Sequence, residues 1–141
     1  MAGEAPPLVV LDASVAAKWF VSDGEDGVPD AHALLSAHSA GEIRLVAPAL
    51  IAHELLGVMA RGRRDAPNVR GAIETFYDTG VALVAPDLDM MLVAADLVTE
   101  RRIHALDSAY AALAMTLDCE LATADRKLAR TLDGTVAIRA V

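Results

Sequence analysis

The stretch that decides the fold is LVVLDASVAAKWF, residues 8–20. Four apolar residues, 8–11, lead directly into the carboxylate of Asp12, and the hydroxyl of Ser14 follows before the apolar pattern resumes. A short, wholly apolar run is typical of a strand that is covered on both faces. The acid that ends the run can be a helix cap, or it can form one wall of a metal site.

The composition is that of a folded domain of ordinary size. At 141 residues the chain is long enough to enclose a single hydrophobic core. A hydrophobic content of 55% and a mean hydropathy of +0.39 exclude a disordered chain. No apolar run approaches the roughly 18 to 20 residues that a membrane span requires. We therefore expect a soluble protein that makes no contact with a membrane.

The N-terminus and the cysteine content indicate the compartment. The first residues, MAGEAPP, contain an acid and precede only a short apolar run, which does not indicate a signal peptide. Cys119 is the one cysteine of the chain, so no internal disulfide can form. A cytoplasmic location is the expectation.

The net charge limits how the protein can bind nucleic acid. Twelve basic against 20 acidic residues give a formal charge of −8, which argues against binding over a wide basic face. An acidic protein can still act on phosphodiesters if its acids hold metal ions, because bound cations reverse the local field. Three arginines near each other in RGRRDAPNVR are candidates for RNA binding, although a solvated helix end is the simpler interpretation. They are Arg61, Arg63 and Arg64.

Short apolar runs alternate with longer helical stretches along the chain. The expected strands are 8–11, 44–47, 81–85, 119–122 and 136–138, and the expected helices are 29–40, 49–63, 69–79, 88–101, 108–117 and 126–132. Alternation of this kind predicts an α/β domain with a mostly parallel sheet and helices on both faces. No repeat, low-complexity segment or linker divides the chain, so we expect one domain.

Acids follow the expected strands or begin the helices after them. Asp12 ends the first strand, Asp125 follows the fourth in CELATADRKLA, and Asp107 begins a helix in HALDSAYAALA. Ligands of open α/β sheets bind in the crevice beyond the carboxyl ends of the strands, which is where these acids are expected to meet. Each acid taken singly can instead be an N-cap, a position at which Asp is favoured.

Glu54 in PALIAHELLGVMA is harder to explain by local structure. The residues three and four positions away share its helical face, and none has a polar side chain: Leu50, Ile51, Gly57 and Val58. A carboxylate buried on such a face needs a cation, a hydrogen-bonding partner or a metal. His53 beside it is more simply a polar neighbour than a ligand.

Four acids in one crevice would repel each other strongly unless divalent cations were bound. Oxygen ligands with little nitrogen or sulfur suit Mg²⁺ or Mn²⁺ rather than zinc or copper. Such a site is suited to phosphodiester hydrolysis, in which one ion activates water and a second, about 3.5–4 Å away, stabilises the leaving oxygen. No nucleophilic Cys or Ser is required.

Four segments in this order resemble a known family: LDASVAAKWF, APALIAHELLGVM, HALDSAYAALA and LATADRKLA. They look like the signature segments of PIN-domain ribonucleases, and most like VapC-type toxins of bacterial toxin–antitoxin pairs, over residues 8–138. The resemblance implies a PIN-like three-layer α/β/α domain with roughly five strands in its mostly parallel sheet. We expect this single domain to take up residues 1–141, with residues 1–7 as a flexible tail. It also implies an Mg²⁺- or Mn²⁺-dependent endoribonuclease, a cognate VapB-like antitoxin that inhibits it, and a homodimer.

The resemblance assigns roles to particular positions. The four catalytic and metal-binding acids would be Asp12, Glu54, Asp107 and Asp125. The first and third would be the most direct ligands, and the other two would bind directly or through water. Ser14 and Thr123 match small hydroxyl positions that orient a carboxylate or a metal-bound water, although a local turn bond explains them equally well. Tyr110, one turn after the third acid, either supports the pocket or is a buried aromatic.

Three competing classes of protein would each require different sequence features. A receiver-type phosphoacceptor domain would need an acid pair after its first strand, an acceptor Asp after its third and a Lys after its fifth, whereas the lysines here are Lys18 and Lys127. Neither glycine-rich phosphate-loop motif of the nucleotide-binding folds occurs. A catalytically silent PIN-like scaffold is the stronger alternative, against which the retention of all four acids counts.

The expected dimer and the expected antitoxin each suggest a surface. Trp19, Phe20 and the helix over 49–60 add apolar residues beyond the needs of a small core, so we expect them at a dimer interface. An acidic crevice that lacks its metal attracts an arginine, whose planar fork can bind carboxylates through paired hydrogen bonds. We therefore expect the antitoxin to insert an arginine among the four acids.

Overall fold

The computed structural model describes residues 3–20, 26–62 and 66–141. Within them, five strands form one sheet in the order β3-β2-β1-β4-β5, and all four neighbouring pairs are parallel. The strands are β1 (Leu8–Leu11), β2 (Arg44–Pro48), β3 (Ala82–Val84), β4 (Glu120–Thr123) and β5 (Ile138–Ala140). Because every strand runs the same way, their carboxyl ends meet at one edge of the sheet.

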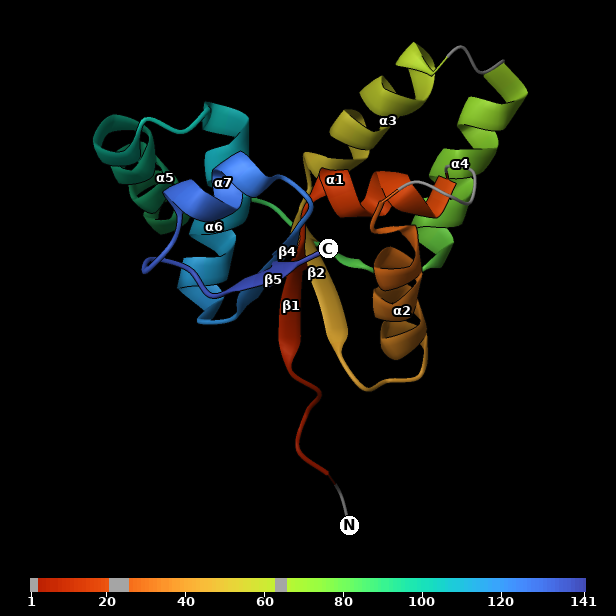
Figure 1. Cartoon of the computed structure of the whole chain (residues 1–141), viewed down its shortest axis with the longest axis horizontal. Helices are drawn as coiled ribbons and strands as arrows, with labels where there is room; N and C mark the ends of the chain where they lie inside the picture. The colour runs from red at the N-terminus through yellow and green to blue at the C-terminus, as the bar shows by residue number, and fades with distance from the viewer. Residues whose placement is uncertain (1–2, 21–25, 63–65) are drawn as a thin grey trace.

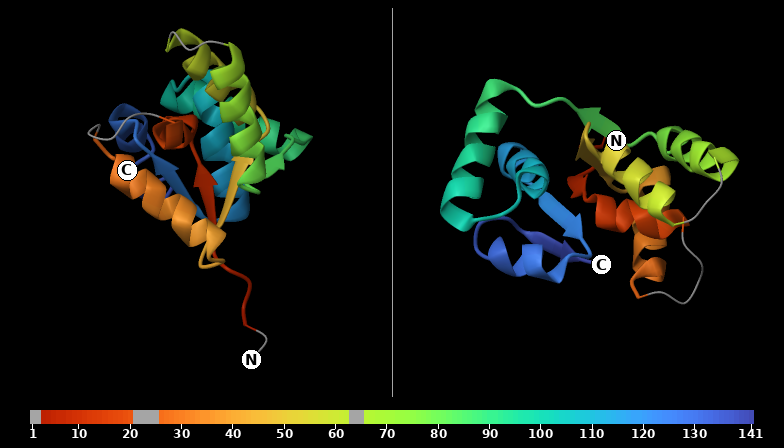
Figure 2. Two further views of the ribbon diagram at one scale, coloured as in Figure 1. Left: turned by 90° about the vertical axis from the view of Figure 1, so that its right-hand side faces the viewer. Right: turned by 90° about the horizontal axis from the view of Figure 1, so that it is seen from above.

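Helices cover both faces of the sheet, as Figures 1 and 2 show. One layer contains α1 (Ala13–Ala16), the 3-10 helix η1 (Ala17–Phe20), α2 (Val28–Ser39), α3 (Ile51–Arg61) and α4 (Ala66–Asp78). The other contains α5 (Leu88–Arg101), α6 (Ala105–Leu117) and α7 (Arg126–Thr131). The predicted three-layer α/β/α architecture is confirmed. No helix in the described part of the chain is both long and apolar enough to cross a membrane.

Successive strands are added first on one side of β1 and then on the other. The chain adds β2 and then β3 on one side of β1, and β4 and then β5 on the other. Right-handed crossovers in opposite directions place the connecting helices on opposite faces. The crevice between β1 and β4 is therefore a topological switch point, where ligands of α/β proteins usually bind. The backbone N–H of Asp12 donates to Ala122 O at 3.1 Å and holds this acid at the switch point.

The core is apolar because the central strands have helices on both sides. Val9, Val10 and Leu11 of β1 are buried, and α6 packs against β1, β2 and β4 through a face rich in small residues. Ala111, Ala112 and Ala114 of α6 are buried there beside the larger side chains of Tyr110 and Leu113. Burying each large apolar side chain of such a core contributes about 1.5–3 kcal/mol.

Some predicted boundaries are wrong. The last strand was expected at 136–138 but is Ile138–Ala140, because Thr135 and Val136 donate their N–H groups back to Leu132 O and prolong the turn after α7. The helix expected at 108–117 begins three residues earlier, at Ala105, with extended His104 as its N-cap. The short helices α1 and η1 were not predicted, since four-residue elements carry little periodicity.

The apolar residues assigned to a dimer interface are largely part of the core. Trp19 is 9% exposed, and its indole N–H donates to Ala31 O on α2 at 2.8 Å. Phe20 is half-buried, and the apolar face of α3 is buried against the domain. The prediction that these residues supply exposed surface is therefore wrong for Trp19, whereas Leu56 on α3 is 41% exposed, and the dimer itself stays a prediction. Large exposed apolar side chains gather instead near the starts of α5 and α6: Leu88, Met91, Leu92 and Leu106.

Candidate functional site

A cleft of about 500 Å³ opens at the carboxyl edge of the sheet. Each of its acids comes from a different segment: the end of β1, the first turn of α3, the first turn of α6 and the start of α7. They are the four predicted acids, Asp12, Glu54, Asp107 and Asp125. The fold thus brings together carboxylates that are as much as 113 residues apart in the sequence.

Asp12 is the most buried of the four, with 6% of its surface exposed. Ser14 Oγ and Thr123 Oγ1 each donate a hydrogen bond to its Oδ2, both at 2.7 Å. Although Asp12 stands at the N-cap position of α1, its side chain makes no capping bond, so the interpretation as a cap is wrong for this carboxylate. Two donors on one oxygen hold the carboxylate in a single orientation.

The two hydroxyls also tie the turns on either side of the cleft together. Ser14 Oγ accepts from the N–H of Ala124, and Thr123 Oγ1 accepts from the N–H of Asp125, each at 3.0 Å. Because each hydroxyl oxygen already accepts a bond from the backbone, its own proton is directed at Asp12. Both interpretations offered for Thr123 are therefore correct: its hydroxyl makes a local turn bond and also orients a carboxylate.

Glu54 has a partner in the core. Tyr110, which is fully buried, donates its hydroxyl to Glu54 Oε1 at 2.6 Å. Burial raises the pKa of Glu54, the Tyr110 bond lowers it, and the charges of Asp12 and Asp107 raise it. Burial and the same bond raise the pKa of Tyr110 far above its usual range, so the phenol remains a donor. Tyr110 is both the buried aromatic and the pocket support that were considered from the sequence.

The remaining two acids differ in whether the side chain also caps a helix. Asp107 is half-buried and is not a cap, because the helix begins before it. Asp125 is exposed and does cap α7, since its Oδ1 accepts from the N–H of Leu128 at 3.0 Å. The capping interpretation is thus wrong for the first and right for the second, which lines the cleft at the same time.

Electrostatic repulsion inside the cleft favours a bound cation. Burial raises the pKa of Asp12, its hydroxyl partners lower it, and the charge of Asp125 raises it again. Burial also raises the pKa of Asp107, as do the charges of Asp12 and Asp125, whereas His104 lowers it. Asp12, Glu54 and Asp107 are therefore harder to ionise because of neighbouring charges as well as burial, and a cation among them would relieve that cost.

The donor set fits a hard divalent ion by its chemistry. Carboxylate oxygens, supported by hydroxyls, are the ligands that Mg²⁺ and Mn²⁺ take in proteins. No three His, Cys, Asp or Glu side chains within residues 3–20, 26–62 and 66–141 form a closed group around a possible ion position. Mg²⁺ usually keeps several waters and binds through one or two carboxylates, so it does not require such a cage.

Of the three arginines predicted to bind RNA, one lies among the described residues. Arg61, at the end of α3, lines the cleft, as does His53, which is exposed. Arg63 and Arg64 lie outside the described residues. Leu50 and Leu106 form apolar parts of the lining and also border a neighbouring apolar groove of about 300 Å³. Sequence reasoning missed Leu106 because the helix that contains it was expected to begin after it.

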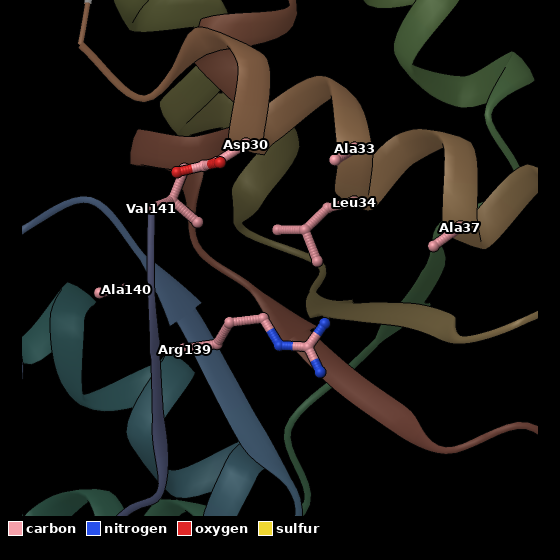
Figure 3. Close-up of a pocket in the computed structure, with 7 residues that line it drawn as sticks. All are labelled: Asp30, Ala33, Leu34, Ala37, Arg139, Ala140 and Val141. Atoms are coloured by element: carbon pink, nitrogen blue, oxygen red, sulfur yellow. The ribbon is translucent and has the colours of Figure 1, made fainter.

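A second hollow, of about 330 Å³, lies between α2 and the end of β5 (Figure 3). Leu34 and Arg139 face it from the two sides. The Arg139 guanidinium is already paired with Glu120 through hydrogen bonds of 3.0 and 3.1 Å. Because Asp30 supplies the one acidic side chain of its lining, this hollow has no cluster of acidic side chains, and the cleft at the sheet edge is the candidate site.

Comparisons with known proteins agree with this fold. A family model described as the PIN domain matches residues 9–133. No curated protein matches the chain.

Several solved structures share the fold at low sequence identity. VapBC2 from Rickettsia felis, bound to a DNA fragment from its promoter, has a TM-score of 0.72 at 14% identity, covering 94% of this chain and 98% of that one. PAE2754 from Pyrobaculum aerophilum has a TM-score of 0.61 at 23% identity, with 95% and 83% covered. Mycobacterium tuberculosis VapC20, described as a toxin that cleaves the sarcin–ricin loop, has a TM-score of 0.67 at 13% identity, with 86% and 93% covered.

Proposed function

The chain belongs to the PIN domain family, and we propose that it is a metal-dependent endoribonuclease that acts as the toxin of a toxin–antitoxin pair. The observation that carries the proposal is the cleft in which four carboxylates from separate segments line one space at the switch point of the sheet. Their mutual repulsion and oxygen chemistry suit Mg²⁺ or Mn²⁺.

The four acids would hold the metal ion, either directly or through water. A bound Mg²⁺ or Mn²⁺ would supply a Lewis acid that activates water and stabilises the leaving oxygen of a phosphodiester. Asp12 and Asp107 would be its most direct ligands, while Glu54 and Asp125 would bind directly or through water. The residues around them fix the geometry before substrate arrives, which is the main contribution that a protein makes to such a site.

Two of the four proposed ligands, Asp12 and Glu54, are positioned by hydroxyl groups of neighbouring side chains. Ser14 and Thr123 hold one oxygen of Asp12, and Tyr110 holds one oxygen of Glu54. These bonds stabilise the charged carboxylates, because a hydrogen bond to the ionised form favours it. The charged form is the one that a divalent cation requires.

The proposed substrate and partner come from the relatives of similar fold. VapC20 is described as a toxin that cleaves the sarcin–ricin loop, and VapBC2 is described as bound to a DNA fragment from its promoter. We therefore propose RNA as the substrate and a VapB-like antitoxin as the inhibitor, with an arginine of the antitoxin inserted among the four acids. Homodimer formation and a cytoplasmic location belong to the same proposal.

The test is to express the protein without its antitoxin and to sequence the 5′ ends of cellular RNA fragments. We expect new ends at defined positions of one RNA class, and the same ends when the purified protein acts on that RNA with Mg²⁺ or Mn²⁺. EDTA should abolish the cleavage in vitro. An RNA population that is unchanged in cells and in vitro would contradict the proposed activity and favour a silent scaffold.

A further inference from the structure

Gly57 stands in the interior of α3, where glycine is unfavourable. Glycine there costs stability relative to alanine, because the unfolded chain loses more freedom when it folds. The usual reason for glycine is a positive φ, but among the described glycines this applies to Gly27, Gly41, Gly80 and Gly134 and not to Gly57. The backbone at Gly57 would accept any L-residue, so another reason for the glycine must be sought.

A side chain at position 57 would make a tight contact with the Arg61 guanidinium. An ideal Cβ at Gly57 would lie 3.3 Å from Arg61 Nη1 and 4.0 Å from Arg61 Cζ. The guanidinium of Arg61 therefore lies against the bare helix backbone, one turn back from its own Cα, as helical side chains do. Glu54 is the next residue along the same face, and all three line the acid cleft.

Arg61 is not neutralised by the acids beside it. Among residues 3–20, 26–62 and 66–141 the ion pair found is that of Arg139 with Glu120, and Arg61 forms none. Arg61 is also the one arginine or lysine among the described residues that line the cleft. A guanidinium that forms no ion pair with any described acid, at the rim of a carboxylate site in a chain of charge −8, is placed to receive an anion.

An RNA strand brings more than one phosphate to such a cleft. The phosphate that is cleaved must lie by the acids, where a cation can offset its charge, and the strand continues past them with a phosphate at every nucleotide. Guanidinium binds phosphate through two parallel hydrogen bonds, which fixes orientation as well as affinity. We propose that Arg61 binds a backbone phosphate beside the cleaved one, and that Gly57 leaves the space in which its guanidinium lies. This inference rests on the proposed ribonuclease function.

The first test measures binding of a short, fluorescein-labelled single-stranded RNA of mixed sequence, with Ca²⁺ in place of Mg²⁺, over a series of KCl concentrations. Arg61→Ala should weaken binding about 10- to 100-fold, the usual effect of losing a charge-assisted hydrogen bond. It should also lower the slope of log affinity against log salt by about 0.7, the value for one contact to a single strand. Arg61→Lys should keep the slope and recover part of the affinity, because it keeps the charge without the fork.

A matched control is Arg44→Ala. Arg44 is exposed and begins β2, at the end of the sheet opposite the acids, so its removal should change neither affinity nor slope. In cleavage assays with Mg²⁺, Arg61→Ala should raise KM more than it lowers kcat, because the contact is present in both the bound substrate and the transition state.

The second test separates the role of Gly57 in binding from its role in folding. Gly57→Ala should raise the melting temperature, since alanine favours the helix, and should weaken RNA binding slightly, because the Arg61 guanidinium must move a few tenths of an ångström to make room for the new methyl group. In an Arg61→Ala background it should still raise the melting temperature but should no longer change RNA binding.

Three outcomes would overturn the inference, and they are distinguishable. If the wild-type protein cleaves RNA but Arg61→Ala binds it with unchanged affinity and salt slope, Arg61 is not a phosphate ligand and the ribonuclease function stands. If Gly57→Ala weakens binding equally with and without Arg61, the glycine acts by another route. If the wild-type protein neither binds nor cleaves RNA, the inference and the proposed function fail together.

Discussion

Tyr110→Phe removes one oxygen atom from the core and should reveal how Glu54 is held. The Tyr110 hydroxyl donates to Glu54 Oε1 at 2.6 Å from a fully buried position, and phenylalanine fills the same space without the donor. A hydrogen bond to a charged group contributes about 1.5–3 kcal/mol to the free energy of unfolding. Because Glu54 is only half-buried and water partly replaces the bond, we expect a loss near the lower end, about 1.5 kcal/mol.

That loss corresponds to a melting temperature lower by roughly 5 °C for a domain of this size. The measurement is urea and thermal unfolding at neutral pH in the presence of EDTA. Tyr77→Phe is the matched control, because Tyr77 is 56% exposed and should lose nothing measurable. In a Glu54→Gln background the cost of Tyr110→Phe should fall to about 0.5–1.5 kcal/mol, since the bond then joins neutral groups.

The same variant should weaken the site. Without the phenol the pKa of Glu54 rises further, since the Tyr110 bond is the contribution that lowers it. Loss of a residue that orients a ligand usually costs about 10- to 100-fold in metal affinity or activity. If Tyr110→Phe matches Tyr77→Phe in stability and cleaves RNA at the wild-type rate, Tyr110 does not position Glu54 and this reasoning is refuted.

Further predictions concern the charge, assembly and inhibition of the protein. Burial raises the pKa of Asp12 above its ordinary value of 3.8, so ionising it costs stability as the pH rises through the folded pKa. Without metal, Asp12→Asn should therefore have a larger free energy of unfolding than the wild type at pH 7. Urea unfolding over a pH series should show this difference shrink as the pH is lowered, and a difference that does not change with pH would contradict the prediction. Light scattering should give twice the mass of one chain, and a monomer at micromolar concentration would exclude the dimer. Changing the inserted antitoxin arginine to Ala should restore much of the RNA cleavage in a complex that still forms; full inhibition at saturating Mg²⁺ would instead indicate blocked access of RNA.

The features that could be predicted from the sequence are those that depend on strand ends. The run before Asp12 identifies β1, and parallel order then requires the acids after β1 and β4 to meet at one edge of the sheet. Glu54 was recognisable because its apolar helical neighbours leave a carboxylate without a local explanation. The gathering of the four acids in one cleft follows from these two patterns.

Features that depend on distant contacts could not be predicted. Nothing in the pattern around Trp19 says that its indole bonds to Ala31 O on the next helix, so it was assigned to the surface. The start of α6 was placed too late because Asp107 and Ser108 are both good capping residues, whereas extended His104 takes the position in the fold. The approach of Arg61 to Gly57 depends on a side-chain conformation, which composition and spacing do not determine.

The most direct test of the central claim is RNA cleavage by Asp12→Asn and Asp107→Asn in the presence of Mg²⁺ or Mn²⁺. The amide keeps the shape of the carboxyl group but lacks the charge that a hard cation requires. Asp96→Asn, an exposed change on α5, controls for the substitution itself. We predict that both cleft variants remain folded, lose cleavage and lose the thermal stabilisation that Mg²⁺ gives the wild type, while Asp96→Asn keeps both properties. Undiminished cleavage by either cleft variant would remove that residue from the metal site and contradict the account.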